Sequence, residues 1–95
     1  MRTVTDESGR KWRFSLTIGL AEQLKDEGVC DLFDKPHEFR PTILEAIQLF
    51  YDHSATDGEK PSEADLKRAM GPETIKEIES AWRSEIENFT HALNP

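Results

Sequence analysis

The sequence predicts a small α+β domain, mostly helical, in which an N-terminal β-hairpin packs on a bundle of about four helices. Three observations predict this class. Residues 2–16 alternate polar and apolar side chains around a turn-forming segment, as two short strands do. Later segments carry apolar residues at helical spacing, bounded by glycine, proline or capping residues. The length of 95 residues suits one modest core, so residues 1–95 are predicted to form a single domain.

The predicted hairpin covers residues 2–16. It contains a β-branched run, "RTVT", then turn residues, "DESG", and then an alternating segment, "KWRFSL". Trp12, Phe14 and Leu16 are therefore expected on one face of the second strand. Because an isolated two-stranded hairpin is only marginally stable in water, this aromatic face is expected to pack on the helices.

The first helix is predicted over residues 17–27, with Thr17 as its N-cap. Gly28 stands where a residue in the left-handed conformation ends many helices. In that case Val29 follows as the residue that contacts Leu24 in a Schellman ending. The glycine and the valine thus have a structural explanation that needs no chemistry.

The second helix is predicted over residues 41–53, after a loop that contains Pro36. Pro41 suits the first turn of a helix, where its missing N–H group costs no hydrogen bond. Residues 54–61 are polar and broken by glycine and proline, so they are expected to form a loop. The inner face of the helix is expected to be Ile43, Ala46, Ile47 and Phe50, widened by Leu44 and Tyr51.

Two further helices are predicted near the end of the chain. Residues 62–70 have Ser62 as N-cap and Gly71 as the residue that stops the helix. Their inward side chains are expected to be Leu66, Ala69 and Met70. Residues 72–93 have the most regular apolar spacing, at Ile75, Ile78, Trp82, Ile86, Phe89 and Leu93.

The last helix is predicted to be long relative to the domain. At 1.5 Å per residue it spans about 33 Å, whereas the expected radius of gyration is only about 12 Å. Either the helix crosses the whole body, or its C-terminal end protrudes and offers Phe89 and Leu93 to a partner. Tyr51 lies at the edge of an apolar stripe, and an exposed aromatic residue is a common interface anchor. Tyr51, Phe89 and Leu93 are therefore the predicted partner-binding residues.

Charge and composition limit the classes of partner. The chain has 12 basic and 19 acidic residues and a net charge of −7, which argues against nucleic-acid binding. No stretch approaches the roughly 18 apolar residues of a membrane span, so no membrane partner is expected. The single cysteine excludes an intramolecular disulfide, and the N-terminal residues lack the apolar run of a secretory signal. These features favour a cytoplasmic protein.

Cys30 is expected to be structural rather than catalytic. A nucleophilic cysteine needs a lowered pKa, supplied by a nearby cation, a helix N-terminus or a histidine base. Cys30 instead stands beside Asp31 and just after a predicted helix C-terminus, and both disfavour the thiolate. It is interpreted as a small apolar residue at a corner of the chain.

No metal-binding, cofactor-binding or catalytic residues are predicted. His37, His53 and His91 lack the spacing of a zinc site, and "DHSATDG" lacks the ligand pattern of an EF-hand loop. The sequence also lacks the glycine-rich phosphate-binding motifs and the nucleophile elbow. The acidic residues that alternate with the last apolar stripe are expected on a solvated face; they are Glu77, Glu79, Glu85 and Glu87. The chain is therefore interpreted as a non-enzyme.

Four stretches of sequence occur in a characteristic order. They are "KWRFSLTIGLAEQLKDEGVCDLFD", "RPTILEAIQLFYD", "PSEADLKRAMG" and "AWRSEIENF". Phage tail assembly chaperones, including their gene-transfer-agent relatives, have a hairpin that ends in a pattern like W-x-F-x-L-T-I-G-L-A-x-x-L. In that family a G-V-x-D-L turn, an S-E-A-D-L segment and an E-x-x-N-F ending follow. The chain resembles this family from Thr5 to Leu93.

The resemblance implies a tail assembly chaperone that binds the tape measure protein and helps to recruit the tail tube protein. Such proteins keep the hydrophobic helices of the tape measure protein soluble in the host cytoplasm, and they leave before the virion matures. The link after "GVCDLFDKPHEF" is shorter than the family pattern, so no individual binding residue is carried over. Two alternatives remain open: a small structural or adaptor component of a phage particle, and an acidic regulatory module that binds a basic protein.

Overall fold

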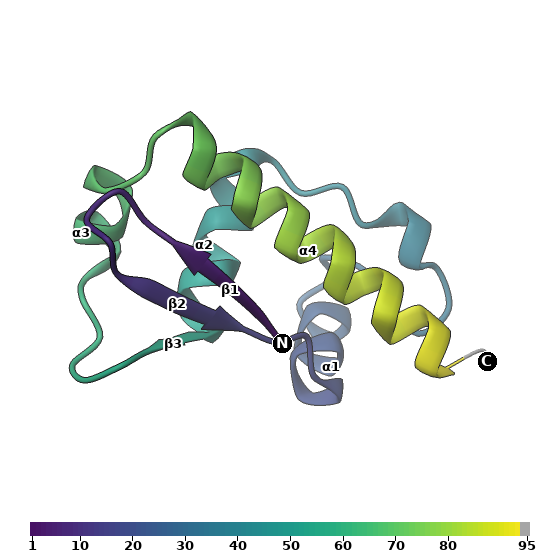
Figure 1. The fold of residues 1–95 in the computed structure, drawn as a ribbon. Coiled ribbons are helices and arrows are strands. Elements are labelled where there is room, and N and C mark those ends of the chain that lie inside the picture. Colours follow the sequence, from purple (N-terminus) through teal and green to yellow (C-terminus); the bar gives the residue numbers. More distant parts are fainter. Residues whose placement is uncertain (94–95) are drawn as a thin grey trace.

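A small antiparallel sheet lies at one end of the molecule, and helices pack along it and extend beyond it (Figure 1). The computed structural model describes residues 1–93, and in this range it confirms the predicted mostly helical α+β class. The strands are β1 (Arg2–Thr5), β2 (Lys11–Phe14) and β3 (Ser54–Thr56). The helices are α1 (Ile18–Asp26), α2 (Ile43–His53), α3 (Glu63–Arg68) and α4 (Pro72–Leu93), with a short 3₁₀ helix, η1 (Pro36–Glu38).

The sheet has three strands in the order β1-β2-β3, rather than the two of the predicted hairpin. The hairpin itself pairs as expected, with Val4 opposite Trp12. The segment predicted as a loop, 54–61, begins with β3, which pairs antiparallel to β2 and places Ser54 opposite Phe14. The Ser-Ala-Thr sequence of β3 carries no apolar alternation. It becomes a strand because the second edge of β2 supplies partners for its backbone groups.

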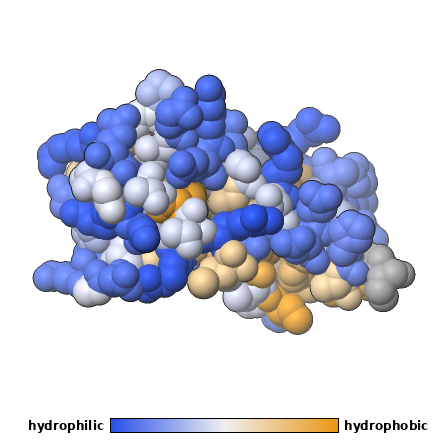
Figure 2. All heavy atoms as spheres, in the orientation of Figure 1, coloured by the Kyte–Doolittle hydropathy of each residue, from blue (hydrophilic) through white to orange (hydrophobic). Residues whose placement is uncertain are grey.

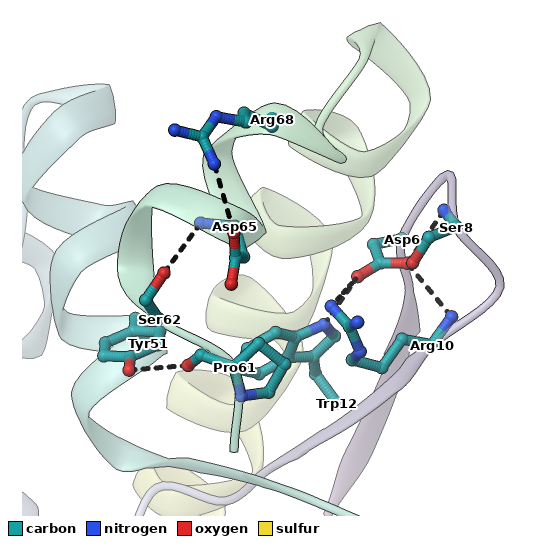
Figure 3. A network of polar contacts seen from close by, with 9 residues as sticks. All are labelled: Asp6, Ser8, Arg10, Trp12, Tyr51, Pro61, Ser62, Asp65 and Arg68. Carbon is teal, nitrogen blue, oxygen red and sulfur yellow. Dashed lines mark hydrogen bonds and ion pairs between the residues drawn. The ribbon is translucent and has the colours of Figure 1, made fainter. Parts of the chain in front are cut away.

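The turn of the hairpin is built around one buried carboxylate, that of Asp6 (Figure 3). Its Oδ1 atom accepts hydrogen bonds from the backbone N–H groups of Ser8 and Arg10, each at 3.0 Å. Its Oδ2 atom accepts one from Nε1 of Trp12 at 3.0 Å. Gly9 has a φ of 86°, a left-handed conformation that favours glycine. Asp6 therefore joins the turn to the aromatic face of the hairpin.

That aromatic face packs on the helices, as predicted. The ring of Phe14 lies 4.7 Å from the ring of Trp82 on α4 and 5.3 Å from that of Phe50 on α2, measured between centroids. The sheet therefore packs on α2 and α4 through aromatic contacts, whose tilted geometry is favourable. The largest fully buried side chains are Trp12, Phe14, Phe50, Leu24, Leu32, Leu66, Ile78 and Val4.

The predicted Schellman ending of α1 is confirmed by its hydrogen bonds. Gly28 has a φ of 73°, and its N–H group donates to the carbonyl of Lys25 at 3.0 Å. The N–H group of Val29 donates to the carbonyl of Leu24 at 2.9 Å, which completes the motif. At the other end, the hydroxyl of Thr17 caps the helix as predicted.

Helix α2 begins later than predicted, at Ile43 rather than at Pro41. Thr42 is the N-cap, and it forms a capping box with Glu45 in which each side chain accepts from the other's backbone N–H group. These reciprocal bonds fix the start of the helix and leave Pro41 outside it. The prediction that Ile43 and Leu44 face inward is wrong, since they are 41% and 65% exposed.

Gly71 does not directly follow the helix that it is predicted to stop, because α3 ends at Arg68, and Gly71 does not have a positive φ. Its role is close packing. A Cβ atom at this position would lie 1.7 Å from Oε1 of Glu7, in the hairpin turn. The backbone N–H group of Glu7 also donates to the carbonyl of Ala69 at 2.8 Å. The link between α3 and α4 is therefore held against the turn of the hairpin.

Glu85 corrects the expectation of a fully solvated acidic face on α4, because it is buried. Its Oε1 atom accepts a hydrogen bond from the backbone N–H group of Leu16 at 2.9 Å, and Oε2 lies 3.5 Å from the N-terminal ammonium group. The alternation of the sequence hides this role, because the partners of Glu85 are a chain end and a backbone amide. Neither group has a signature in the side-chain pattern.

Candidate functional site

An open groove of about 450 Å³ lies between the segment that precedes α2 and one face of α4. Figure 1 shows the segment that links α1 to α2 running beside α4. One wall is formed by residues between Pro36 and Ile43. The other wall is formed by Glu79, Trp82, Arg83 and Ile86 of α4. The groove is the candidate functional site.

The α4 wall follows directly from helical periodicity. Its four residues are spaced as i, i+3, i+4 and i+7, and side chains at these positions lie on one face of a helix. The facing wall is held in place by different means. Pro36 and Pro41 restrict the backbone of the linking segment, and η1 tightens its first turn. The capping box then turns the chain from the wall into α2.

The floor of the groove is the buried edge of Trp82, which is only 4% exposed. Its Nε1 atom donates a hydrogen bond to the backbone carbonyl of Ala46 on α2 at 3.1 Å. Its ring centroid lies 5.0 Å from that of Phe39, a residue of the facing wall, and 4.7 Å from that of Phe14 in the core. These contacts lock the indole, so the floor is part of the core and not a mobile surface side chain.

The rim of the groove carries positive charge, although the whole chain has a net charge of −7. The basic side chains in the lining are Arg40, Arg83 and His37, and the acidic one is Glu79. Arg40 and Arg83 are exposed, and within residues 1–93 neither takes part in an ion pair. The groove therefore combines apolar walls with two guanidinium groups that make no ion pair within residues 1–93, and Glu79 is the acidic residue of the lining.

Tyr51, one of the predicted partner-binding residues, is half-buried and outside this groove. Its hydroxyl donates a hydrogen bond to the carbonyl of Pro61 at 2.7 Å (Figure 3). The ammonium group of Lys60 lies 4.3 Å from the centroid of its ring, a cation–π contact. Its ring also packs near that of Trp12 at 5.9 Å. Tyr51 therefore helps to hold the 54–61 segment on the sheet.

The other two predicted residues lie at the far end of α4. Phe89 is half-buried, and its ring packs edge-on against Phe33 at 5.7 Å. Leu93, in the last turn, is 39% exposed. Figure 2 shows apolar residues gathered below the N-terminus, over α1 and the end of α4, where Met1, Ile18 and Leu93 are exposed. This second apolar surface includes Leu93 but lacks the depth of the groove.

The groove is hard to predict from the sequence because its walls come from separate parts of the chain. The i, i+3, i+4, i+7 spacing of the α4 wall is visible in the sequence, but it does not indicate which residues of the stripe are covered. The exposed position of Ile43 follows from the capping box, whose signal is the threonine three residues before a glutamate. Combining these two signals would have indicated an apolar edge beside α2.

Cys30 is buried at 9% exposure, in agreement with its interpretation as a small apolar residue. Its S–H group donates a weak hydrogen bond to the carbonyl of Lys35 at 3.6 Å. Burial raises the pKa of the thiol, and the negative charges of Glu38 and Asp31 raise it further. The thiol is therefore protonated at neutral pH, which is the reverse of what a nucleophile requires.

Replacing Cys30 with serine is expected to lower the free energy of unfolding by about 1 kcal/mol and to leave partner binding unchanged. The shorter C–O bond leaves the serine oxygen farther from the carbonyl of Lys35 than the sulfur is at 3.6 Å, so the weak hydrogen bond is lost together with the burial of sulfur. Urea unfolding of both proteins measures the cost. In the wild type, a thiol reagent is expected to react far more slowly with the folded than with the unfolded chain. Loss of binding by a folded serine variant would contradict the structural role.

The histidines lie in three different settings. His37 lines the groove, and His91 is exposed in the last turn of α4. His53 ends α2, and its Nε2 atom is buried and has no hydrogen-bond partner among residues 1–93. Within residues 1–93 no group of three or more histidine, cysteine, aspartate or glutamate side chains is placed to hold a metal ion. In the same range, no helix has both the length and the apolar character to cross a bilayer.

Comparisons with models of protein families, with curated proteins and with solved structures find no match to this chain. The inference of function therefore rests on the groove, on the charges at its rim and on the sequence resemblance.

Proposed function

We propose that this chain is a non-enzymatic, protein-binding assembly factor, and specifically a phage tail assembly chaperone. In this proposal it binds the tape measure protein and helps to recruit the tail tube protein in the host cytoplasm, and it leaves before the virion matures. The observation that carries the proposal is the groove between residues 36–43 and α4, with its apolar walls and locked floor. The ordered sequence motifs supply the class of partner.

The shape of the groove supports a helical partner. An amphipathic helix that lies in an apolar groove is a common mode of peptide recognition, in which side chains about one turn apart enter the groove. A chaperone for long hydrophobic helices needs such a surface, together with enough net charge to keep the complex in solution. Ile43 and Ile86 provide apolar walls, and the net charge of −7 provides the second property.

Co-expression with the tape measure protein of the same phage tests the proposal. The tape measure protein is expected to be insoluble alone and soluble as a complex with the wild-type chain. An Ile43→Asp variant is expected to lose most of this effect, because it puts a charge into the groove. Leu44→Asp is the matched control: it makes the same change on the same turn of α2, at a residue that does not line the groove.

Equal solubility of the tape measure protein with and without this chain would refute the chaperone role. If Ile43→Asp and Leu44→Asp reduced that solubility equally, the interaction would lie outside the groove. Mass spectrometry of purified mature particles tests the transient role. The chain is expected in assembling tails and not in finished virions, and its presence in finished virions would instead support a structural component.

A further inference from the structure

We infer that the groove binds an acidic amphipathic helix, whose apolar residues enter the groove while flanking Asp or Glu residues pair with Arg40 and Arg83. The inference rests on the proposed protein-binding function and adds the chemistry that selects the partner. It depends on three features of the groove: its length, its lack of a strand-like wall, and the charge at its rim.

The length of the groove fits a short stretch of helix. From Glu79 to Ile86 the α4 wall rises roughly 10 Å at 1.5 Å per residue, which is about two helical turns. A partner helix with apolar residues at i, i+3, i+4 and i+7 presents its stripe over the same distance. The walls and the volume of about 450 Å³ thus match a few apolar side chains from one face of a helix.

The wall opposite α4 is unsuited to adding a β-strand. It contains Pro36 and Pro41, which lack backbone N–H groups, and the 3₁₀ helix η1 interrupts any extended conformation. A strand needs a regular row of donors and acceptors along its partner. A helix satisfies its own backbone hydrogen bonds, so it can lie against this wall through side chains alone.

The charge at the rim selects an acidic partner. Arg40 and Arg83 are exposed and unpaired within the described residues, and a guanidinium group can bind a carboxylate through two parallel hydrogen bonds. Glu79 stands one turn before Arg83 on the same face and repels a carboxylate placed beside it. The acidic residues of the partner are therefore expected near the two arginines.

The net charge of −7 acts against any acidic partner, but it acts at longer range. At physiological ionic strength the Debye length is about 8 Å, so acidic residues farther than this from the rim are largely screened, and Glu79 is the acidic residue of the lining itself. The two arginines at the rim contact the partner directly and are screened much less. The attraction between the two arginines and the carboxylates of the partner is therefore expected to decide whether the groove prefers an acidic or a basic helix.

Two end-capped synthetic peptides test the inference by titration calorimetry. Both are about 18 residues long, since shorter isolated helices are marginal in water. Both carry a leucine stripe at i, i+3, i+4 and i+7, flanked by glutamate in one peptide and by lysine in the other. The wild-type chain is expected to bind the glutamate peptide at least about tenfold more tightly than the lysine peptide.

A double charge reversal, Arg40→Glu with Arg83→Glu, is expected to invert this preference. The variant is expected to bind the lysine peptide roughly tenfold more tightly than the glutamate peptide. The matched control is Arg2→Glu with Lys11→Glu, which makes the same change in net charge at exposed residues of the hairpin. This control is expected to keep the preference for the glutamate peptide. Ile43→Asp is expected to weaken binding of the glutamate peptide, and Leu44→Asp is not.

Several outcomes would overturn the inference. Equal affinities for the two peptides would show that the rim does not select charge. A preference that the Arg2 and Lys11 reversal abolishes equally would show a general effect of net charge. A doubled mass in solution that Ile43→Asp abolishes would identify a second copy of this chain as the occupant. Since the peptide assay does not involve the tape measure protein, failure of the co-expression test and failure of this test are distinguishable.

Discussion

Replacing Trp82 with alanine is expected to lower the free energy of unfolding by about 4 kcal/mol, the largest effect of any single change considered. Trp82 is buried between the sheet and the linking segment, where its ring packs against Phe14 and Phe39. The substitution leaves a cavity at the point where these elements meet. It also removes the hydrogen bond from Nε1 to the carbonyl of Ala46.

The size of this effect is large relative to the expected stability of the domain. A chain of this length has a total stability of roughly 5–14 kcal/mol, so the variant is expected to melt at least about 15 °C lower. Thermal unfolding followed by circular dichroism measures the shift. Arg83→Ala, at the adjacent exposed position, is the control and is expected to change stability by less than about 0.5 kcal/mol. A Trp82→Ala protein with the wild-type melting temperature would mean that the indole is not part of the core.

Replacing Asp6 with alanine is expected to lower the free energy of unfolding by about 3 kcal/mol. The carboxylate accepts four hydrogen bonds, from the N–H and hydroxyl groups of Ser8, the N–H group of Arg10 and Nε1 of Trp12. Its loss leaves the buried indole N–H group without a partner, and a buried unsatisfied donor is costly. Urea unfolding at pH 7 measures the difference. Glu7→Ala, at the exposed neighbouring position, is the control and is expected to have a small effect.

The same group is expected to make stability depend on pH. Burial acts to raise the pKa of Asp6, but the hydrogen bonds from Ser8, Trp12 and Arg10 outweigh it and hold the pKa below its ordinary value of 3.8. A carboxyl group with a lowered pKa in the folded state contributes stability above its unfolded pKa. That contribution is lost as the pH falls from about 4 through the lower folded pKa.

An Asp6→Asn variant separates charge from shape in this test. The side-chain amide of asparagine cannot be titrated. Both oxygens of Asp6 accept hydrogen bonds, whereas the NH₂ group of asparagine is a donor and must face one of these donors. The variant is therefore expected to be less stable at pH 7. Its stability is expected to fall less than that of the wild type between pH 5 and pH 2.5. If the free energy of unfolding fell equally in the two proteins between pH 5 and pH 2.5, Asp6 would be excluded as a source of the acid sensitivity.

Local signals in the sequence were sufficient for most of the fold. The capping of α1 by Thr17, its end at Gly28 and the full extent of α4 depend on residues close together in the chain. The third strand was not predictable in this way. Residues 54–56 have no strand pattern of their own and pair because the edge of β2 is beside them in the folded chain.

The candidate site was less predictable than the fold, for a related reason. Of the residues predicted to bind a partner, Tyr51 makes internal contacts and Phe89 packs on Phe33, while Leu93 borders a second apolar surface. Whether an apolar residue in a helical stripe is covered depends on what lies opposite it. Ile43 and Trp82 both belong to apolar stripes at helical spacing, yet Ile43 is 41% exposed and Trp82 only 4%.

The sequence by itself determined the class of fold, the hairpin, the positions of the helices and the structural nature of Cys30. Each of these depends on periodicity, capping or charge within a few residues. Only the tertiary structure decided that Glu85 and Asp6 are buried, that residues 54–56 extend the sheet, and that a groove with a basic rim lies beside α4. Apart from the hydrogen bonds of Asp6, which are local to the hairpin, these features join residues far apart in the chain, and their environment exists only when the helices and the sheet pack together.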